Sequence, residues 1–198
     1  MLQGIADVYA YCNQDTHYMN QVLKAVQNTD IDVYLTKSAM NVLHEYYLKK
    51  IADIGHMNNT GLWCSEIGME YNIPTPTINS AVNTRFTSRH VKAVNTASHK
   101  NCAIDFKVAV DALRLVFATS LLEGYDLMDT RHVSNESIKQ AWSSGTIIEC
   151  PMIGEDYRTI IEQTAENARV MVMYCVAAGI PCPAVQAALS QYDFIHEK

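Results

Sequence analysis

NNTGLWCSEIGMEYNIPTPTINSAVNTRF, residues 58–86, is the stretch that decides the fold of this chain. The Thr-Gly pair at Thr60 precedes a helical pattern and predicts a helix N-cap there, because a threonine oxygen can accept a first-turn N–H. Three apolar residues then recur every four positions and would form one stripe: Trp63, Ile67 and Tyr71. The prolines that follow end this helix, and Thr77 is predicted to cap a second one. The stretch by itself predicts a helical hairpin with a polar loop at one end.

Two later blocks of the sequence match motifs of the same protein family as this stretch. Residues 141–148 read AWSSGTII, and residues 178–193 contain AGIPCP followed by ALS and YD. Together with the NTGLW loop and Arg85, they resemble the C-terminal helical domain of 6-phosphogluconate dehydrogenase. That family's motifs read K-G-T-G-K-W, then an arginine, then M-W-R-G-G-C-I-I and A-G-I-P-x-P…A-L-S-x-Y-D. The blocks lie in the family's order, so the resemblance covers nearly the whole chain and implies the family's fold.

The rest of the sequence is helical in pattern, with no alternating strand pattern longer than four residues. The second helix of the hairpin is expected to run past Arg85 toward Val94, and Gly179 is expected to stop a helix. The other expected helices cover residues 1–13, 15–26, 31–49, 103–128, 134–142, 157–164, 165–178 and 183–197. The helix at 103–128 is the longest and most apolar, which makes it the natural central element. We therefore expect one all-α domain over residues 1–198, a multi-helix fold with long central helices.

Composition excludes several function classes. The chain of 198 residues is 48% hydrophobic and 18% charged, with a net charge of -6 and scattered lysines and arginines. No basic stripe is present, so neither nucleic acid nor an anionic membrane is an expected partner. The longest apolar stretches are too short or too interrupted to span a bilayer. With no signal-peptide pattern, a cytoplasmic location is expected. The six cysteines lack CxxC spacing, so no metal site is expected and the thiols should be reduced.

The residues needed for dehydrogenase chemistry do not occur in this sequence. Its eight glycines never fall in the GxGxxG spacing that a dinucleotide fold requires. The resemblance implies that the family's catalytic lysine and glutamate would precede residues 1–12, and that its substrate-binding tail would follow residues 192–197. We therefore expect no catalytic residue, no cofactor and no enzymatic activity in these residues alone.

The sequence partly matches the residues with which the family binds the phosphate group of its substrate. The resemblance implies that Thr60 contacts a phosphate and that Arg85 binds substrate, and Gly61 stands beside Thr60 in the loop of this site. Asn58 stands where the family has a lysine, and Leu62 replaces a second one. An amide cannot supply the charge-assisted bonds of an ammonium group. Two interpretations are open: Thr60 is a helix cap and Arg85 a solvated cation, or the four positions 58, 60, 61 and 85 keep a vestigial anion site.

Two functions follow as hypotheses. The first is a non-catalytic module, because the resemblance implies that this domain builds most of a dimer interface; Val116 and Val172 are candidate positions in the seam. Such a homodimer would bind or assemble with a protein partner, and a stand-alone domain of this kind is typical of phages and mobile elements, which would make a host protein the target. The alternative is one half of a split 6-phosphogluconate dehydrogenase of the pentose phosphate pathway, completed by a separate NADP-binding chain.

Overall fold

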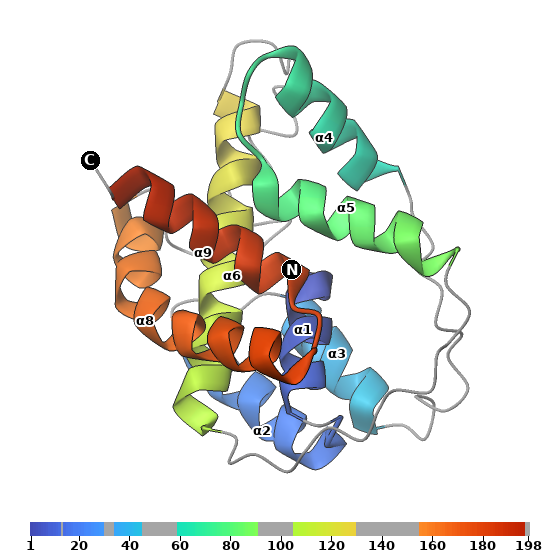
Figure 1. Ribbon diagram of the computed structural model, residues 1–198, viewed down its shortest axis with the longest axis vertical. Coiled ribbons are helices and arrows are strands. Elements are labelled where there is room, and N and C mark those ends of the chain that lie inside the picture. The colour runs from blue at the N-terminus through green and yellow to red at the C-terminus, as the bar shows by residue number, and fades with distance from the viewer. Residues whose placement is uncertain (13, 30–33, 45–58, 91–104, 130–154, 197–198) are drawn as a thin grey trace.

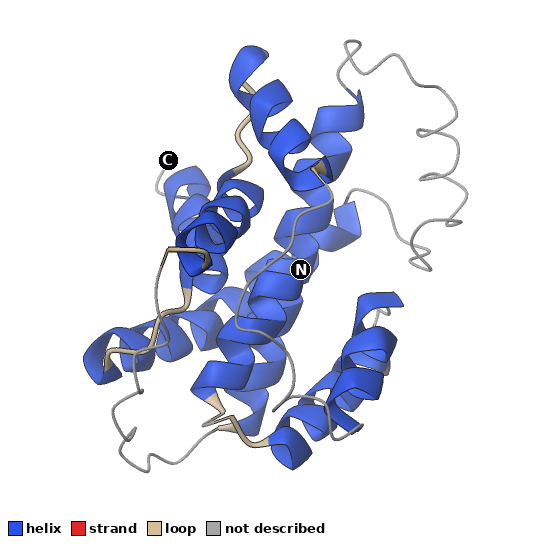
Figure 2. Cartoon of the chain, turned by 90° about the vertical axis from the view of Figure 1, so that its right-hand side faces the viewer, coloured by secondary structure: helices blue, strands red, loops and turns tan. Residues whose placement is uncertain are grey.

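The computed structural model describes residues 1–12, 14–29, 34–44, 59–90, 105–129 and 155–196. The regular structure in these ranges is helical throughout, as Figure 2 shows, and the all-α prediction is confirmed. The expected helix at 134–142 and the motif at 141–148 lie outside the described residues. The helices are α1 (Leu2–Tyr11), α2 (Thr16–Gln27), α3 (Tyr34–His44), α4 (Thr60–Glu70), α5 (Pro76–Ser88), α6 (Phe106–Asp129), α8 (Glu155–Ala178) and α9 (Pro183–His196).

Helix α6 is the centre of the molecule, as its apolar pattern predicted. It packs against α1, α2, α4, α5, α8 and α9, most extensively against α8 (Figure 1). Successive residues around its whole circumference are fully buried, among them Leu113, Leu115, Val116 and Phe117. Within the described ranges, no helix is both long enough and apolar enough to cross a membrane. A helix whose middle is buried on all sides positions the six helices that pack against it.

The charges that interrupt the apolar pattern of α6 are paired inside the protein. Asp111 is 3% exposed and accepts hydrogen bonds from Lys107 on its own helix and from Asn167 Nδ2 of α8 at 2.6 Å. Arg114 approaches the same carboxylate at 3.4 Å. A buried carboxylate such as that of Asp111 is tolerated because donors surround it, although the buried Arg114 Nε forms no hydrogen bond. The pairing also connects α6 to α8.

Two expectations about helix ends are wrong. Residues 157–164 and 165–178 form one helix, α8, because the Thr164 hydroxyl donates to the Ile160 carbonyl at 2.7 Å within the helix instead of capping a new one. The second hairpin helix ends at Ser88 rather than running toward Val94. The predicted stop at Gly179 is confirmed: its φ is +70°, and Ile180 N–H closes the helix on the Cys175 carbonyl at 2.8 Å.

Helix α9 is held at both ends by residues from elsewhere in the chain. At its start, the buried Asp7 of α1 accepts the N–H groups of Ala184 at 2.7 Å and Val185 at 3.1 Å. Near its end, Arg169 of α8 forms a bidentate ion pair with Asp193, at 2.8 and 2.6 Å. A bidentate guanidinium–carboxylate pair fixes orientation as well as distance. These contacts set how α9 lies across α6 and α8.

Candidate functional site

The first turn of α4 begins differently from the prediction. Thr60 is the first residue of the helix and not its cap; the N-cap is Asn59, which has φ +63° and makes no side-chain capping bond. Asn59 contributes only its backbone carbonyl, which accepts from Trp63 N–H at 2.9 Å. Asn59 has a left-handed backbone and precedes the first helical residue, Thr60. The helix therefore begins one residue earlier than it would if Thr60 were the cap. The first-turn N–H groups of α4 therefore lack a side-chain cap.

The predicted apolar stripe of α4 faces outward. Trp63 is 47% exposed and Tyr71 is 37% exposed, whereas the buried positions of the helix are the small residues Ser65 and Gly68. Helix α4 thus approaches its neighbour through small side chains, and a Cβ on Gly68 would stand 2.9 Å from the Thr75 hydroxyl. The small residues, and not the apolar stripe, therefore make the closest packing of this helix.

The hairpin brings the start of α4 to the end of α5, where Arg85 lies. A Cβ on Gly61 would meet Val82 Cγ2 at 3.2 Å, and Val82 is one turn before Arg85. Arg85 is half-buried and forms no ion pair with any described carboxylate. Gly61 therefore lies against α5 one turn before Arg85. Asn58, another predicted site position, lies outside the described residues.

The start of α5 is capped by a residue that sequence reasoning missed. Thr77 is not the cap; the N-cap position is Thr75, and the α6 residue Glu123 accepts the backbone N–H of Thr77 at 2.8 Å and of Ile78 at 2.9 Å. Glu123 is 1% exposed. Burial raises the pKa of its carboxyl group to about 7, against the lowering effect of the two N–H bonds. The only local signal was an acidic residue between the apolar positions of α6.

The start of α1 joins the same region. The Met1 amino group lies within electrostatic reach of Glu123, Arg85 and Asp7, and burial lowers its pKa to about 6. Both carboxylates are already engaged as helix caps, Asp7 for α9 and Glu123 for α5. Arg85 is the group here that remains available to an anion. Among the described residues, this region therefore combines a cation that could hold a negative charge with two carboxylates that cap helices.

The described cysteines and other possible ligands do not form a metal site. Within the described ranges no three His, Cys, Asp or Glu side chains gather in a way that could hold a metal ion. Cys12 and Cys175 are buried, and burial raises the pKa of both thiols. For Cys175 the larger cause is the hydrogen bond with Cys182, which in turn lowers the pKa of the Cys182 thiol. A raised pKa makes Cys12 and Cys175 poor nucleophiles, and both serve as core packing.

The chain matches one known protein family and is similar in sequence to several known proteins. Residues 1–155 match the family described as 6-phosphogluconate dehydrogenase, C-terminal domain. The chain is 26% identical over 237 residues to a decarboxylating 6-phosphogluconate dehydrogenase of Lactococcus lactis, and 24% identical over 226 residues to the one of Homo sapiens. These alignments cover 97% and 90% of this chain but 50% and 46% of the relatives. The chain thus spans about half the length of the relatives it matches.

A solved structure agrees on the fold. The Plasmodium falciparum 6-phosphogluconate dehydrogenase, solved in its apo form and with its cofactor NADP+ and its substrate 6-phosphogluconate, superposes with a TM-score of 0.74. The superposition covers 98% of this chain and 52% of that chain, at 16% sequence identity. At this identity the likeness establishes the fold, and with it the expected multi-helix architecture.

Proposed function

The chain belongs to the family of the 6-phosphogluconate dehydrogenase C-terminal domain, and on that premise we propose that these residues act as a non-catalytic, dimeric assembly module. Dimerisation is the property that the family resemblance implies for this domain. The module would present its remaining surface to a protein partner, such as a host protein if the chain is of phage origin. The proposal concerns the 198 residues by themselves.

An exposed apolar stripe on α8 carries this proposal. Val170 is 51% exposed, Met173 is 66% exposed and Val176 is 66% exposed, at intervals of three residues along one side of the helix. Single exposed apolar side chains are common on protein surfaces, but several that adjoin one another often mark an interface. A second copy of the chain is the occupant we assign, because a two-fold contact lets each copy cover the other's stripe.

One of the two positions predicted from sequence to lie in the dimer interface is wrong. Val116 is fully buried inside the molecule, where it lies against Gly4, so it cannot face a partner. Val172 is half-buried and packs against the core. The exposed positions on either side of it, Val170 and Met173, are the better test sites.

Light scattering tests the dimer. The expected mass at micromolar concentration is near twice 22.2 kDa. Met173→Asp should shift it to the monomer, since an unpaired carboxylate in an apolar contact is costly. Met69→Asp on α4 is the matched control, because Met69 is 71% exposed and lies on a different helix; it should leave the mass unchanged. A folded wild-type monomer at high concentration would contradict the proposal.

Absence of catalysis is tested separately. The purified chain, given 6-phosphogluconate and NADP or NAD, is expected to form no reduced nicotinamide above background. The sequence lacks a dinucleotide-binding glycine pattern, and Glu123 and Asp7 are occupied as helix caps. Without a held cofactor and a positioned base, a hydride has no acceptor. Turnover that copurifies with the chain would refute this part.

One observation favours the alternative of a split dehydrogenase. Arg85, the first turn of α4 and the start of α1 converge on one region, and Arg85 has no described ion-pair partner. A separately supplied NADP-binding chain could complete a substrate site there. The discriminating experiment mixes this chain with such a polypeptide and repeats the assay. Activity that requires both chains and is lost in Arg85→Ala would replace the first proposal with this one.

A further inference from the structure

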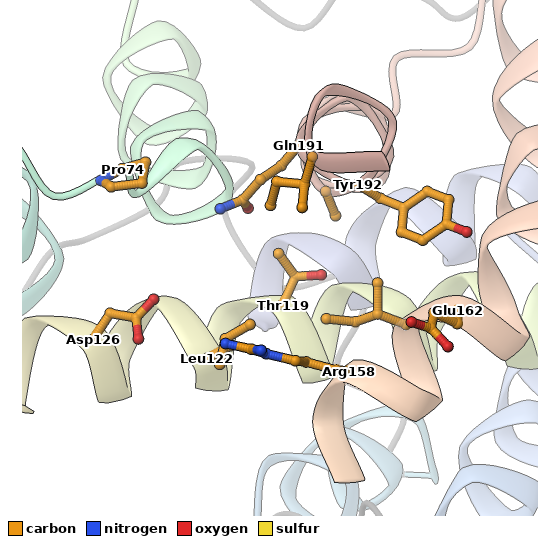
Figure 3. Close-up of a pocket in the computed structure, with 11 residues that line it drawn as sticks. Pro74, Thr119, Leu122, Asp126, Arg158, Glu162, Gln191 and Tyr192 are labelled. Carbon is orange, nitrogen blue, oxygen red and sulfur yellow. The ribbon is translucent and has the colours of Figure 1, made fainter. Parts of the chain in front are cut away.

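The packing of α6, α8 and α9 has two features that the proposed dimer does not use, a cavity and a pair of thiols. The cavity, of about 390 Å³, lies between the three helices (Figure 3). Its lining includes Thr119 and Leu122 of α6, together with Arg158 and the carboxylates of Asp126 and Glu162. Charges of both signs favour neither an anion nor a cation. The lining therefore selects no class of ligand, and the thiols are the feature with a distinct chemistry.

The pair of thiols belongs to Cys175 and Cys182, at the opposite ends of α8 and α9 from the cavity. Cys175 lies in the last turn of α8, and Cys182 immediately precedes Pro183, the first residue of α9. Both are buried free thiols, and they are hydrogen-bonded to each other. A disulfide needs a sulfur–sulfur distance of about 2 Å, so two sulfurs already in contact can be joined after a small movement.

The turn between α8 and α9 both brings the two thiols together and covers them. Gly179 reverses the chain with φ +70°, and Ile180 N–H donates to the Cys175 carbonyl at 2.8 Å. Residues 177–179 and Pro181 are exposed, whereas Cys175 and Cys182 are buried beneath them. Exposed turns with few packing contacts open locally at a small cost in free energy. Opening of this one turn would bring a small reagent from solvent to the thiols.

The hydrogen bond makes the two thiols chemically unequal. Donation by the Cys175 S–H to the Cys182 sulfur lowers the pKa of Cys182 and raises the pKa of Cys175. Burial and the charge of Asp7 oppose the lowering of the Cys182 pKa. The thiolate is the nucleophilic form of a cysteine. Cys182 is therefore the sulfur that attacks, and Cys175 is the partner that keeps its proton beside it.

We propose that Cys175 and Cys182 form a reversible oxidation site, at which a peroxide converts the two thiols into a disulfide that joins the end of α8 to the start of α9. The direct contact of the two thiols and the exposed turn above them support this proposal. Peroxides oxidise thiolates, and hydrogen peroxide is small enough to enter through one opened turn. The proposal does not depend on the dimer or on the anion region.

The reaction takes two steps. The Cys182 thiolate attacks a peroxide oxygen, the O–O bond breaks, and Cys182 becomes a sulfenic acid; with hydrogen peroxide, the leaving hydroxide takes up the proton that Cys182 released and becomes water. The Cys175 sulfur then attacks the Cys182 sulfur, the S–O bond breaks, and the Cys175 proton leaves with the hydroxyl group as a second water. The thiols lose two electrons in total, and the peroxide gains both. Contact between the sulfurs makes the second step effectively unimolecular, which offsets the poor nucleophilicity of Cys175.

Peptide mass spectrometry tests the site, with hydrogen peroxide as the probe. Trypsin cleaves after Arg169, and residues 170–198 contain no lysine or arginine before Lys198 and no cysteine besides this pair. The reduced protein is treated with a small molar excess of peroxide, and the remaining thiols are then alkylated in denaturant. The peptide 170–198 should be lighter than its reduced form by two hydrogen atoms and carry no alkyl group, and dithiothreitol should reverse the change. A peptide alkylated at both cysteines, or linked to a different cysteine, would overturn the proposal.

Variants identify the role of each thiol, with circular dichroism to verify that each variant is folded. In Cys175→Ala the sulfenic acid of Cys182 has no partner, so dimedone should label it. In Cys182→Ala the Cys175 thiol should stay reduced and be alkylated. Cys12→Ala is the matched control, because Cys12 is a buried thiol with a raised pKa outside the pair; its disulfide yield should equal that of the wild type. Loss of the disulfide in Cys12→Ala, or dimedone labelling of Cys175 in place of Cys182, would show that the assignment is wrong.

Discussion

Gly4 of α1 lies so close to Val116 of α6 that a Cβ atom built on the glycine would stand 2.6 Å from Val116 Cγ1. Real Cβ contacts are not that short, so the two helices can approach this closely only because residue 4 has no side chain. Residue 4 therefore controls how α1 docks on the central helix. This close approach leads to a prediction about stability.

Gly4→Ala is expected to destabilise the protein by about 1–3 kcal/mol through overpacking, measured by urea unfolding. Adding Val116→Ala removes the methyl groups that clash, so the double variant should lose less stability than the sum of the two single variants. Gly179→Ala is the control: with φ +70° and no atom within 4 Å of a Cβ, it should cost about 1 kcal/mol through backbone strain, and Val116→Ala should not rescue it. A Gly4→Ala variant as stable as the wild type would contradict the predicted clash.

The pH dependence of stability should run opposite to that of most proteins. Burial raises the pKa of Asp7 from 3.8 to about 6 and that of Glu123 from 4.5 to about 7. The folded state therefore binds more protons than the unfolded state between about pH 4 and pH 7. The stabilisation from the protonated carboxyl groups is complete below that window and is lost as the pH rises through it. The Met1 amino group, whose pKa burial lowers from 8.0 to about 6, acts in the opposite sense between about pH 6 and pH 8. The free energy of unfolding should consequently fall between about pH 5 and pH 6, where, of these three groups, only the two carboxyl groups titrate.

Glu123→Gln should flatten this dependence, because glutamine keeps an acceptor for the α5 N–H groups and does not titrate. Glu70→Gln at an exposed position of α4 is the matched control and should leave the pH profile unchanged. Urea unfolding at several pH values measures both. A wild-type stability that rises steadily from about pH 5 to pH 8 would show that the two carboxyl groups are not held as described.

Two isosteric substitutions of buried threonines should have opposite effects on stability. Thr119→Val removes a hydroxyl without a partner and should stabilise the protein by about 1 kcal/mol, since a buried unsatisfied polar group is costly. Thr164→Val removes a hydroxyl that donates to Ile160 and should destabilise it by about 1 kcal/mol. Thermal unfolding compares the two variants directly. Destabilisation of equal size in both would mean that Thr119 also bonds to its own helix.

Anion binding at the hairpin end should be weak. Phosphate, followed by amide chemical shifts at Thr60 and Gly61, is expected to bind no more tightly than about millimolar, roughly -4 kcal/mol, because Asn58 stands where a lysine would help. Arg85→Ala should abolish the shifts. Arg89→Ala, at an exposed position four residues on, should not. Micromolar affinity that depends on Arg85 would favour the split dehydrogenase.

Much of the fold could be predicted from local sequence, because its signals lie within a few residues of each other. Asp15 was expected near the start of α2 and accepts the N–H groups of His17 and Tyr18 at 2.9 and 3.0 Å. Gly179 ends α8, and the apolar run of α6 makes it central. The family motifs led to the same architecture, which the comparisons confirmed.

The caps of α5 and α9 could not be predicted in this way. Glu123 lies 46 residues from Thr77 and Asp7 lies 177 residues from Ala184, so no window of sequence contains both partners. Thr60 and Thr77 each had the residue type of a cap, but a left-handed Asn59 and a carboxylate from α6 took those roles. The cavity at Thr119 is formed by three helices whose order in sequence does not reveal their contact. Periodicity and capping residues act along the chain, whereas burial and long-range hydrogen bonds depend on which helices meet, and only the packed structure brings them together.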